Sequence, residues 1–273
     1  MDPTLFSLLQ AYSSLKHPRL LSFPSHLPFS QVHDFLLSSV LLNPHLLQYP
    51  PSHTYQLFFW KWVIEHLEPL LENEEDAEID QRVYDQLISL VAMSKPVAHD
   101  VVSPPTPSFV TYYWNLTVRS GSLASTDAIF PEYHSVTLFE SRTTIENGTT
   151  GLRTWRASLI LAQFLIRNPS MTCANSLFAI FTCHLAILVN KTILELGSGA
   201  GFLGLVVADI QVSRAEVTGH NALYLTDVND AVLRRCYENT RLSCSRRIAH
   251  VARRAAKSFQ MRLTCMNAYL SSR

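Results

Sequence analysis

Apolar residues recur at intervals of three and four through the first 95 residues of the chain. One set comprises Leu5, Leu8, Leu9, Tyr12 and Leu15, and a second comprises Val32, Phe35, Leu36, Val40 and Leu41. This spacing predicts amphipathic helices. Six prolines between positions 18 and 51 interrupt the pattern, so we expect several short helices. The strongest helix is expected at 54–71, and a further helix is expected at 81–93 after an acidic, solvated run at 72–80.

The pattern changes after residues 103–109, whose prolines predict a linker. Alternation of apolar and polar residues at 135–141 predicts a strand. A helix is expected to follow from about Thr154, with a buried stripe of Trp155, Leu159, Ala162, Leu165 and Ile166.

The next part of the chain alternates between strand and helix. Residues 193–196 predict a short buried strand, and the apolar residues from Phe202 predict a buried helix. Residues 222–226 predict a second strand that ends at Asp227, and 230–240 predict a further helix. This order favours an α/β fold with a parallel sheet.

Four of the eight glycines lie in one turn between the strand at 193–196 and the helix that follows it. They are Gly197, Gly199, Gly201 and Gly204. Glycine is favoured where backbone bends tightly or approaches a ligand closely. A strand, a glycine turn and a helix together form a nucleotide-binding crevice, in which backbone N–H groups face the ligand.

Charge and cysteine content narrow the possible functions. The 22 basic and 22 acidic residues balance, which argues against a DNA-binding protein or a membrane-surface binder. The five cysteines form no C-x-x-C pair, and the N-terminus lacks the basic start of a signal peptide, so we expect a cytoplasmic protein. The apolar stretch 176–189 is too short to span a bilayer. The histidines show no ligand spacing, so we expect no metal, and we expect a monomer.

Two ligands remain open for the glycine turn. Gly199, Gly201 and Gly204 form G-x-G-x-x-G, which also suits the dinucleotide of an NAD-type oxidoreductase. Glu195, two residues before Gly197, favours a cationic amino-acid group such as the ammonium of S-adenosylmethionine and would repel a pyrophosphate. Exchanging Glu195 for a neutral residue should therefore help a dinucleotide and weaken S-adenosylmethionine binding. Asp227, at the end of the second strand, is the expected ribose ligand.

The segment "ELGSGAG" and Asp227 resemble motifs I and II of the seven-strand class I methyltransferases. Together with "TTGLRTWRASLILAQFLIRNP" upstream, "NKTILELGSGAGFLGL" resembles the elongation factor 2 lysine methyltransferase family. The resemblance implies a Rossmann-like core after an N-terminal α-helical region, with methyl transfer from S-adenosylmethionine to a lysine of translation elongation factor 2. It also implies that Gly197, Ser198, Gly199 and Gly201 line the cofactor, that Asp227 binds the ribose and that Trp155 forms one wall.

Parts of the chain depart from that family. Residues 114–134 and 170–189 interrupt the pattern, and the basic tail does not resemble it. One interpretation of the tail is a basic amphipathic helix with Ile248, Val251 and Ala255 on one side. The other, which we favour, is that the reading frame of the family was lost near Leu242. We therefore predict a helical region at 1–110, a partial methyltransferase core at 111–240 and an atypical tail at 241–273.

Only 76 residues follow Gly197, whereas completing a doubly wound sheet takes roughly 120. The family's D-x-x-Y-like motif and a second cofactor-contacting tryptophan are not found, so no catalytic residue is assigned. We expect this chain not to catalyse methyl transfer. A non-catalytic fragment whose helical part binds protein is the alternative.

Overall fold

A computed structural model of the chain describes residues 1–71, 74, 77–94, 105–115, 133–167, 188, 191–214 and 222–245, and the backbone of 260–265. Most of both predicted interruptions, at 114–134 and 170–189, lies outside these described residues. So does the alternative of an amphipathic helix around Val251. The chain divides into two compact units, Met1–Tyr112 and Tyr113–Arg273.

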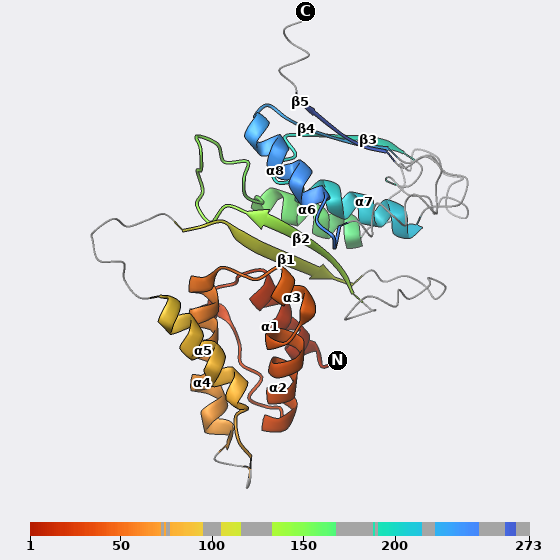
Figure 1. The fold of residues 1–273 in the computed structure, drawn as a ribbon. Coiled ribbons are helices and arrows are strands. Elements are labelled where there is room, and N and C mark those ends of the chain that lie inside the picture. Colours follow the sequence, from red (N-terminus) through yellow and green to blue (C-terminus); the bar gives the residue numbers. More distant parts are fainter. Residues whose placement is uncertain are drawn as a thin grey trace, which may run out of the picture. The chain divides into compact units, whose positions relative to one another are not determined.

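The first unit is built from short helices, as the spacing of apolar residues predicts (Figure 1). They are α1 (Pro3–Ser13), the 3-10 turn η1 (Pro18–Leu20), α2 (Phe29–Phe35), the π-helical η2 (Leu36–Leu41), α3 (Pro44–Gln48), α4 (His53–Leu71) and α5 (Gln81–Met93). Side-chain oxygens of Asp2, Asn43 and Asp80 accept backbone N–H groups at the starts of α1, α3 and α5. These caps satisfy donors that a helix cannot pair internally.

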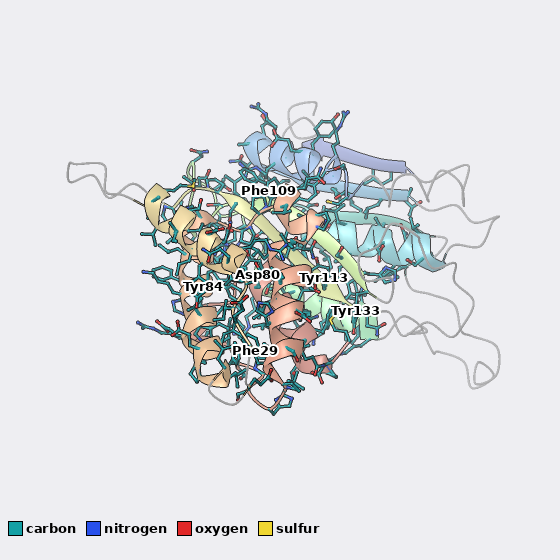
Figure 2. The ribbon with its side chains drawn as sticks, turned by 60° about the horizontal axis from the view of Figure 1, so that its bottom comes forward. Phe29, Asp80, Tyr84, Phe109, Tyr113 and Tyr133 are labelled. Atoms are coloured by element: carbon teal, nitrogen blue, oxygen red, sulfur yellow. The ribbon has the colours of Figure 1, made fainter. Side chains whose placement is uncertain are left out.

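Aromatic side chains fill the core of the first unit. Phe59 and Trp60 of α4 are 0% and 1% exposed, and the Phe59 ring centroid lies 4.4 Å from that of Tyr12. Phe29 and Asp80, labelled in Figure 2, are joined through His33, which stacks on Phe29 and accepts the backbone N–H of Asp80 at 3.0 Å. This core is closed by its own helices.

The second unit contains the predicted α/β pattern. Strands β3 (Thr192–Leu196), β4 (Ala222–Asp227) and β5 (Gln260–Cys265) form a parallel sheet in the order β3-β4-β5. The helices are α6 (Arg156–Arg167), α7 (Phe202–Arg214) and α8 (Asp230–Thr240). The predicted strands and helices around the glycine turn are therefore confirmed, and the tail adds β5.

A separate two-stranded sheet pairs β1 (Ser108–Trp114) with β2 (His134–Glu140). The strand predicted at 135–141 is confirmed as β2. The linker prediction at 103–109 is wrong at its end, because Ser108 and Phe109 begin β1. Ser108 is buried and Phe109 is half-buried, and the β-branched and aromatic residues that follow them favour a strand.

The three-stranded sheet is covered by helices on one face. Figure 1 shows α7 and α8 on that face, where Leu223 and Leu225 of β4 are fully buried. Leu194 and Leu196 of β3 point to the opposite face and are 59% and 65% exposed. The prediction of a buried strand is therefore wrong for its outer face, because none of the described helices covers it.

Candidate functional site

The glycine turn follows β3 and has a backbone that few other residues could adopt. Gly197, Gly199 and Gly201 have φ angles of +68°, +56° and +95°. Side chains with a Cβ are strained in this left-handed region. The concentration of glycine in the sequence is thus explained by the conformation of the turn.

The same turn is tightly packed on one side and open on the other. A Cβ on Gly201 would lie 2.9 Å from Cys236 Sγ, and one on Gly204 would lie 2.4 Å from Leu225 Cδ2. A Cβ on Gly197 would meet nothing within 4 Å. The turn is therefore pressed against its own unit at Gly201 and Gly204, and Gly197 faces the open space that a ligand could enter.

Ser198 ties the turn to the end of β4. Its backbone N–H donates to the Thr226 carbonyl at 2.8 Å, and its Oγ accepts the Thr226 N–H at 3.0 Å. The Thr226 hydroxyl in turn donates to the carbonyl of Glu195 at 2.8 Å. Because Ser198 is only 7% exposed, its side chain fixes the two strand ends together.

Asp227 lies beside the glycine turn, although 28 residues separate it from Gly199 in the chain. Its Oδ2 accepts the N–H of Gly199 at 3.2 Å, and its Oδ1 accepts the N–H of Asn229 at 3.1 Å. An ionised carboxylate has about four acceptor positions, so two remain for hydroxyl donors. The structure thus brings together Gly199 and Asp227.

Glu195 lies on the face of β3 that is turned toward the helices. Burial raises the pKa of its carboxyl to about 7, and the nearby backbone N–H of Gly204 lowers it in part. Its Oε2 is buried and makes no hydrogen bond of normal geometry to any described residue. Glu195 therefore sits beneath the turn, close to the N-terminal end of α7, as an acid that holds its proton up to neutral pH.

Trp155 is placed differently from the prediction. It precedes α6 and is 53% exposed, so its assignment to a buried helical stripe is wrong. The cause is local, because its indole N–H donates to the Thr150 carbonyl at 3.0 Å and holds the ring in the preceding loop. Of the predicted stripe, only Ala162 is fully buried.

That loop also contacts the glycine turn, which sequence reasoning missed. A Cβ on Gly199 would lie 3.2 Å from the carbonyl oxygen of Gly151. The loop is anchored at its ends, where Ser141 N–H donates to the Leu152 carbonyl at 2.8 Å and the Thr154 hydroxyl donates to Glu140 Oε1. Glu140 is 2% exposed, and burial raises the pKa of its carboxyl. Gly151, the glycine of "TTG", is the sequence feature that could have indicated this contact.

Within the same described ranges, no group of three or more His, Cys, Asp or Glu side chains could hold a metal ion. Among the described helices, none is long and apolar enough to cross a membrane.

Strand β3, the glycine turn, α7 and Asp227 at the end of β4 define the core of a class I methyltransferase fold. The comparisons with known proteins agree with that class. A family model described as "Lysine methyltransferase" matches residues 136–251. Residues 136–251 of the chain are therefore similar to the lysine methyltransferase family.

Several curated proteins are similar to the chain. It is 32% identical over 160 residues to "Protein-lysine N-methyltransferase EFM3" of Chaetomium thermophilum, which covers 58% of this chain and 39% of that protein. It is 44% identical over 89 residues to "Protein-lysine N-methyltransferase EEF2KMT" of Homo sapiens, which covers 33% of this chain and 22% of that protein. The Mus musculus protein of that name is 43% identical over a stretch of the same length. The chain spans 39% or less of the length of these relatives.

Proposed function

We propose that the chain carries the cofactor-binding part of an S-adenosylmethionine-dependent protein-lysine methyltransferase whose substrate is translation elongation factor 2. The observation that carries the proposal is the contact between Asp227 and the N–H of Gly199 beside an open Gly197. The match of residues 136–251 to the lysine methyltransferase family model supports the reaction class. The similar proteins are named protein-lysine N-methyltransferases, which supports a protein substrate.

The residues of the site fit the cofactor. The free acceptor positions of Asp227 suit the two ribose hydroxyls of an adenosyl group. The unobstructed side of Gly197 allows a ligand to approach the backbone, and Ser198 and Gly199 continue the same turn. The exposed ring of Trp155 is available as an apolar wall. Glu195 would act on the amino-acid end of the cofactor through its charge only above neutral pH, where its carboxyl has lost the proton. Gly201 keeps the turn against the helices.

The chemistry that such a site supports is positioning. S-adenosylmethionine, when bound, supplies a methyl group that is transferred to the lysine nitrogen. The chain's own residues hold the adenosyl group through Asp227 and the glycine turn, and Glu195 supplies a negative charge beneath the turn once its proton is lost. Alignment of this kind is a large part of the rate enhancement in group transfer.

Calorimetric titration of the full chain with S-adenosylhomocysteine tests the cofactor. We expect a micromolar Kd for the unaltered chain and no binding by Gly199→Arg. Gly148→Arg is the matched control, because Gly148 also has a positive φ, of +73°, and has nothing within 4 Å of an added Cβ. It should bind normally. Absence of binding by the folded, unaltered chain contradicts the proposed cofactor.

A parallel titration with NAD separates the oxidoreductase alternative. Binding of NAD that strengthens in Glu195→Gln would support that alternative, since removal of the acid removes its repulsion of a pyrophosphate. We expect instead no NAD binding and weaker S-adenosylhomocysteine binding by Glu195→Gln.

The substrate is tested by methyl incorporation into purified elongation factor 2 from radiolabelled S-adenosylmethionine. Incorporation that disappears in Gly199→Arg would support the full proposal. A second candidate function is a non-catalytic protein-binding role, which is favoured by the exposed outer face of β3. Cofactor binding without incorporation, together with capture of elongation factor 2 by the full chain, would support that role.

A further inference from the structure

A buried amide on α8 lies against the glycine turn. Asn239 is 0% exposed, and its Nδ2 donates to the Ala200 carbonyl at 2.9 Å. Its Oδ1 accepts the backbone N–H of Phe139 on β2 at 2.8 Å, and Nδ2 also reaches the Phe139 carbonyl at 3.3 Å. Asn239 thus joins β2 to the glycine turn, because its partners Phe139 and Ala200 lie 61 residues apart in the chain.

The bond to Ala200 fixes one peptide plane of the turn. The Ala200 carbonyl and the Gly201 N–H belong to the same peptide group. The Gly201 N–H donates to the Ser198 carbonyl at 3.0 Å, and Asn239 holds the opposite side of the plane. Gly201, at φ +95°, has no side chain to prevent that plane from rotating. The side-chain amide of Asn239 therefore restrains the rotation of the Ala200–Gly201 peptide plane, which no side chain on Gly201 can do.

The bond to Phe139 connects this restraint with the loop beside the site. Phe139 precedes Glu140, whose carboxylate accepts the Thr154 hydroxyl at the far end of that loop. Arg235 of α8 also reaches the Phe139 carbonyl, at 3.4 Å, and lies over its ring. The side-chain amide of Asn239 offers a donor to Ala200 and an acceptor to Phe139 at once. An ionised carboxylate can only accept, and serine has a single, shorter-reaching oxygen in place of the two separate amide atoms.

We propose that Asn239 is a positioning residue that holds the Ala200–Gly201 peptide in the orientation required for S-adenosylmethionine binding, and that it aligns this turn with β2. The inference rests on the proposed function for its binding consequence. Its structural consequence, the order of the turn, can be measured without any ligand.

The experiment compares Asn239→Asp with Asn43→Asp in the full chain. Asparagine to aspartate keeps the shape and the acceptor that binds Phe139, but places an oxygen without a proton against the Ala200 carbonyl. Asn43 is a matched control in the first unit, because it is also 0% exposed, accepts the His45 N–H at 2.9 Å and donates to the Ser39 carbonyl at 2.9 Å.

Amide hydrogen exchange followed by mass spectrometry is the first readout. We expect peptides that cover residues 197–204 to exchange at least tenfold faster in Asn239→Asp, with β4 little changed. The second readout is calorimetric titration with S-adenosylhomocysteine, in which Asn239→Asp should raise the Kd at least tenfold. Asn43→Asp should leave both the exchange of the turn and the Kd within twofold of the unaltered chain.

The outcomes separate the two proposals. If the unaltered chain binds no S-adenosylhomocysteine, the proposed function fails, but selective exchange of the turn still supports the role of Asn239. Exchange that rises equally in the turn and in β4 would show a purely structural residue and overturn the inference. Asn239→Ser keeps the chain neutral and should show the same selective effect. Unfolding of both Asn239 variants, with Asn43→Asp folded, would also overturn it.

Discussion

Similar apolar residues are buried in the core of the helical unit and exposed to solvent on the outer face of the three-stranded sheet. In α4, Phe59 and Leu67 are fully buried by neighbouring helices of the same unit. In β3, Leu194 and Leu196 are more than half exposed. Full burial of an apolar side chain stabilises the folded state by about 1.5–3 kcal/mol. The buried side chains of α4 contribute this stabilisation, whereas the exposed leucines of β3 contribute little of it.

This difference shows which part of the chain can be stable by its own contacts. Each long helix of the first unit has a covered apolar side. The three-stranded sheet is covered by helices only on the face that carries Leu223 and Leu225. The glycine turn lies at the junction of that covered face with α7 and α8. The site is consequently supported from the buried side of the sheet, while the exposed side adds a risk of aggregation.

The largest expected effect tests the helical core. Phe59→Ala should lower the free energy of unfolding by about 3–5 kcal/mol, because a fully buried ring is lost and a cavity remains. Urea unfolding of the full chain, followed by tryptophan fluorescence, measures it. Phe58→Ala is the control, since that neighbouring ring is 53% exposed and should cost far less. Equal effects of the two substitutions would show that the core is not closed.

The next effect concerns the acid beneath the turn. Burial raises the pKa of Glu195 from its ordinary 4.5 to about 7, so between these pH values the folded chain holds a proton that the unfolded chain releases. The free energy of unfolding should therefore fall as pH rises from 4.5 to 7, by on the order of 2 kcal/mol from this group. Glu195→Gln should remove this part of the fall. Urea unfolding at pH 5 and pH 8 measures it, and parallel pH profiles of the two chains would contradict the prediction.

A smaller effect is expected at the loop that contacts the turn. Thr154→Val removes the hydroxyl that donates to the buried carboxyl of Glu140 and should cost about 1–2 kcal/mol. Thr240→Val, which removes an exposed hydroxyl that bonds the Tyr237 carbonyl, should cost less than about 0.5 kcal/mol. Thermal unfolding monitored by circular dichroism compares them. A cost for Thr154→Val no larger than for Thr240→Val would argue against a role for the buried pair.

Sequence periodicity was sufficient for the helices of the first unit and for the elements around the glycine turn, but not for β1 or β5. The three-four spacing located the short helices, and the strand, glycine turn and helix located β3, α7 and β4. The sequence assigned Gly199 and Asp227 to one cofactor crevice, and their contact agrees with the rule that parallel strands end at the same edge of a sheet. These features depend on local pattern or on general topology, so sequence alone can carry them.

Other features depend on three-dimensional neighbours that no local pattern reports. Leu194 looks apolar and therefore buried, but its exposure is decided by whether a helix covers that face. Trp155 fits a helical stripe, but a single bond from its indole N–H to Thr150 holds it in the loop. Asn239 has an ordinary helical context in sequence, and its three bonds to Ala200 and Phe139 appear only once β2 and the turn meet α8.

The smallest expected effect on stability returns to the outer face of β3. The double variant Leu194→Thr, Leu196→Thr should change the free energy of unfolding by less than about 0.5 kcal/mol, because both side chains are already solvated and threonine suits a strand. Leu225→Ala on the covered face is the contrast and should cost about 2–5 kcal/mol. Solubility should rise in the double variant, measured by light scattering at increasing concentration, since fewer apolar groups remain to associate. A loss of stability comparable with that of Leu225→Ala would mean that these leucines are covered in solution, and the two faces of the sheet would then no longer differ.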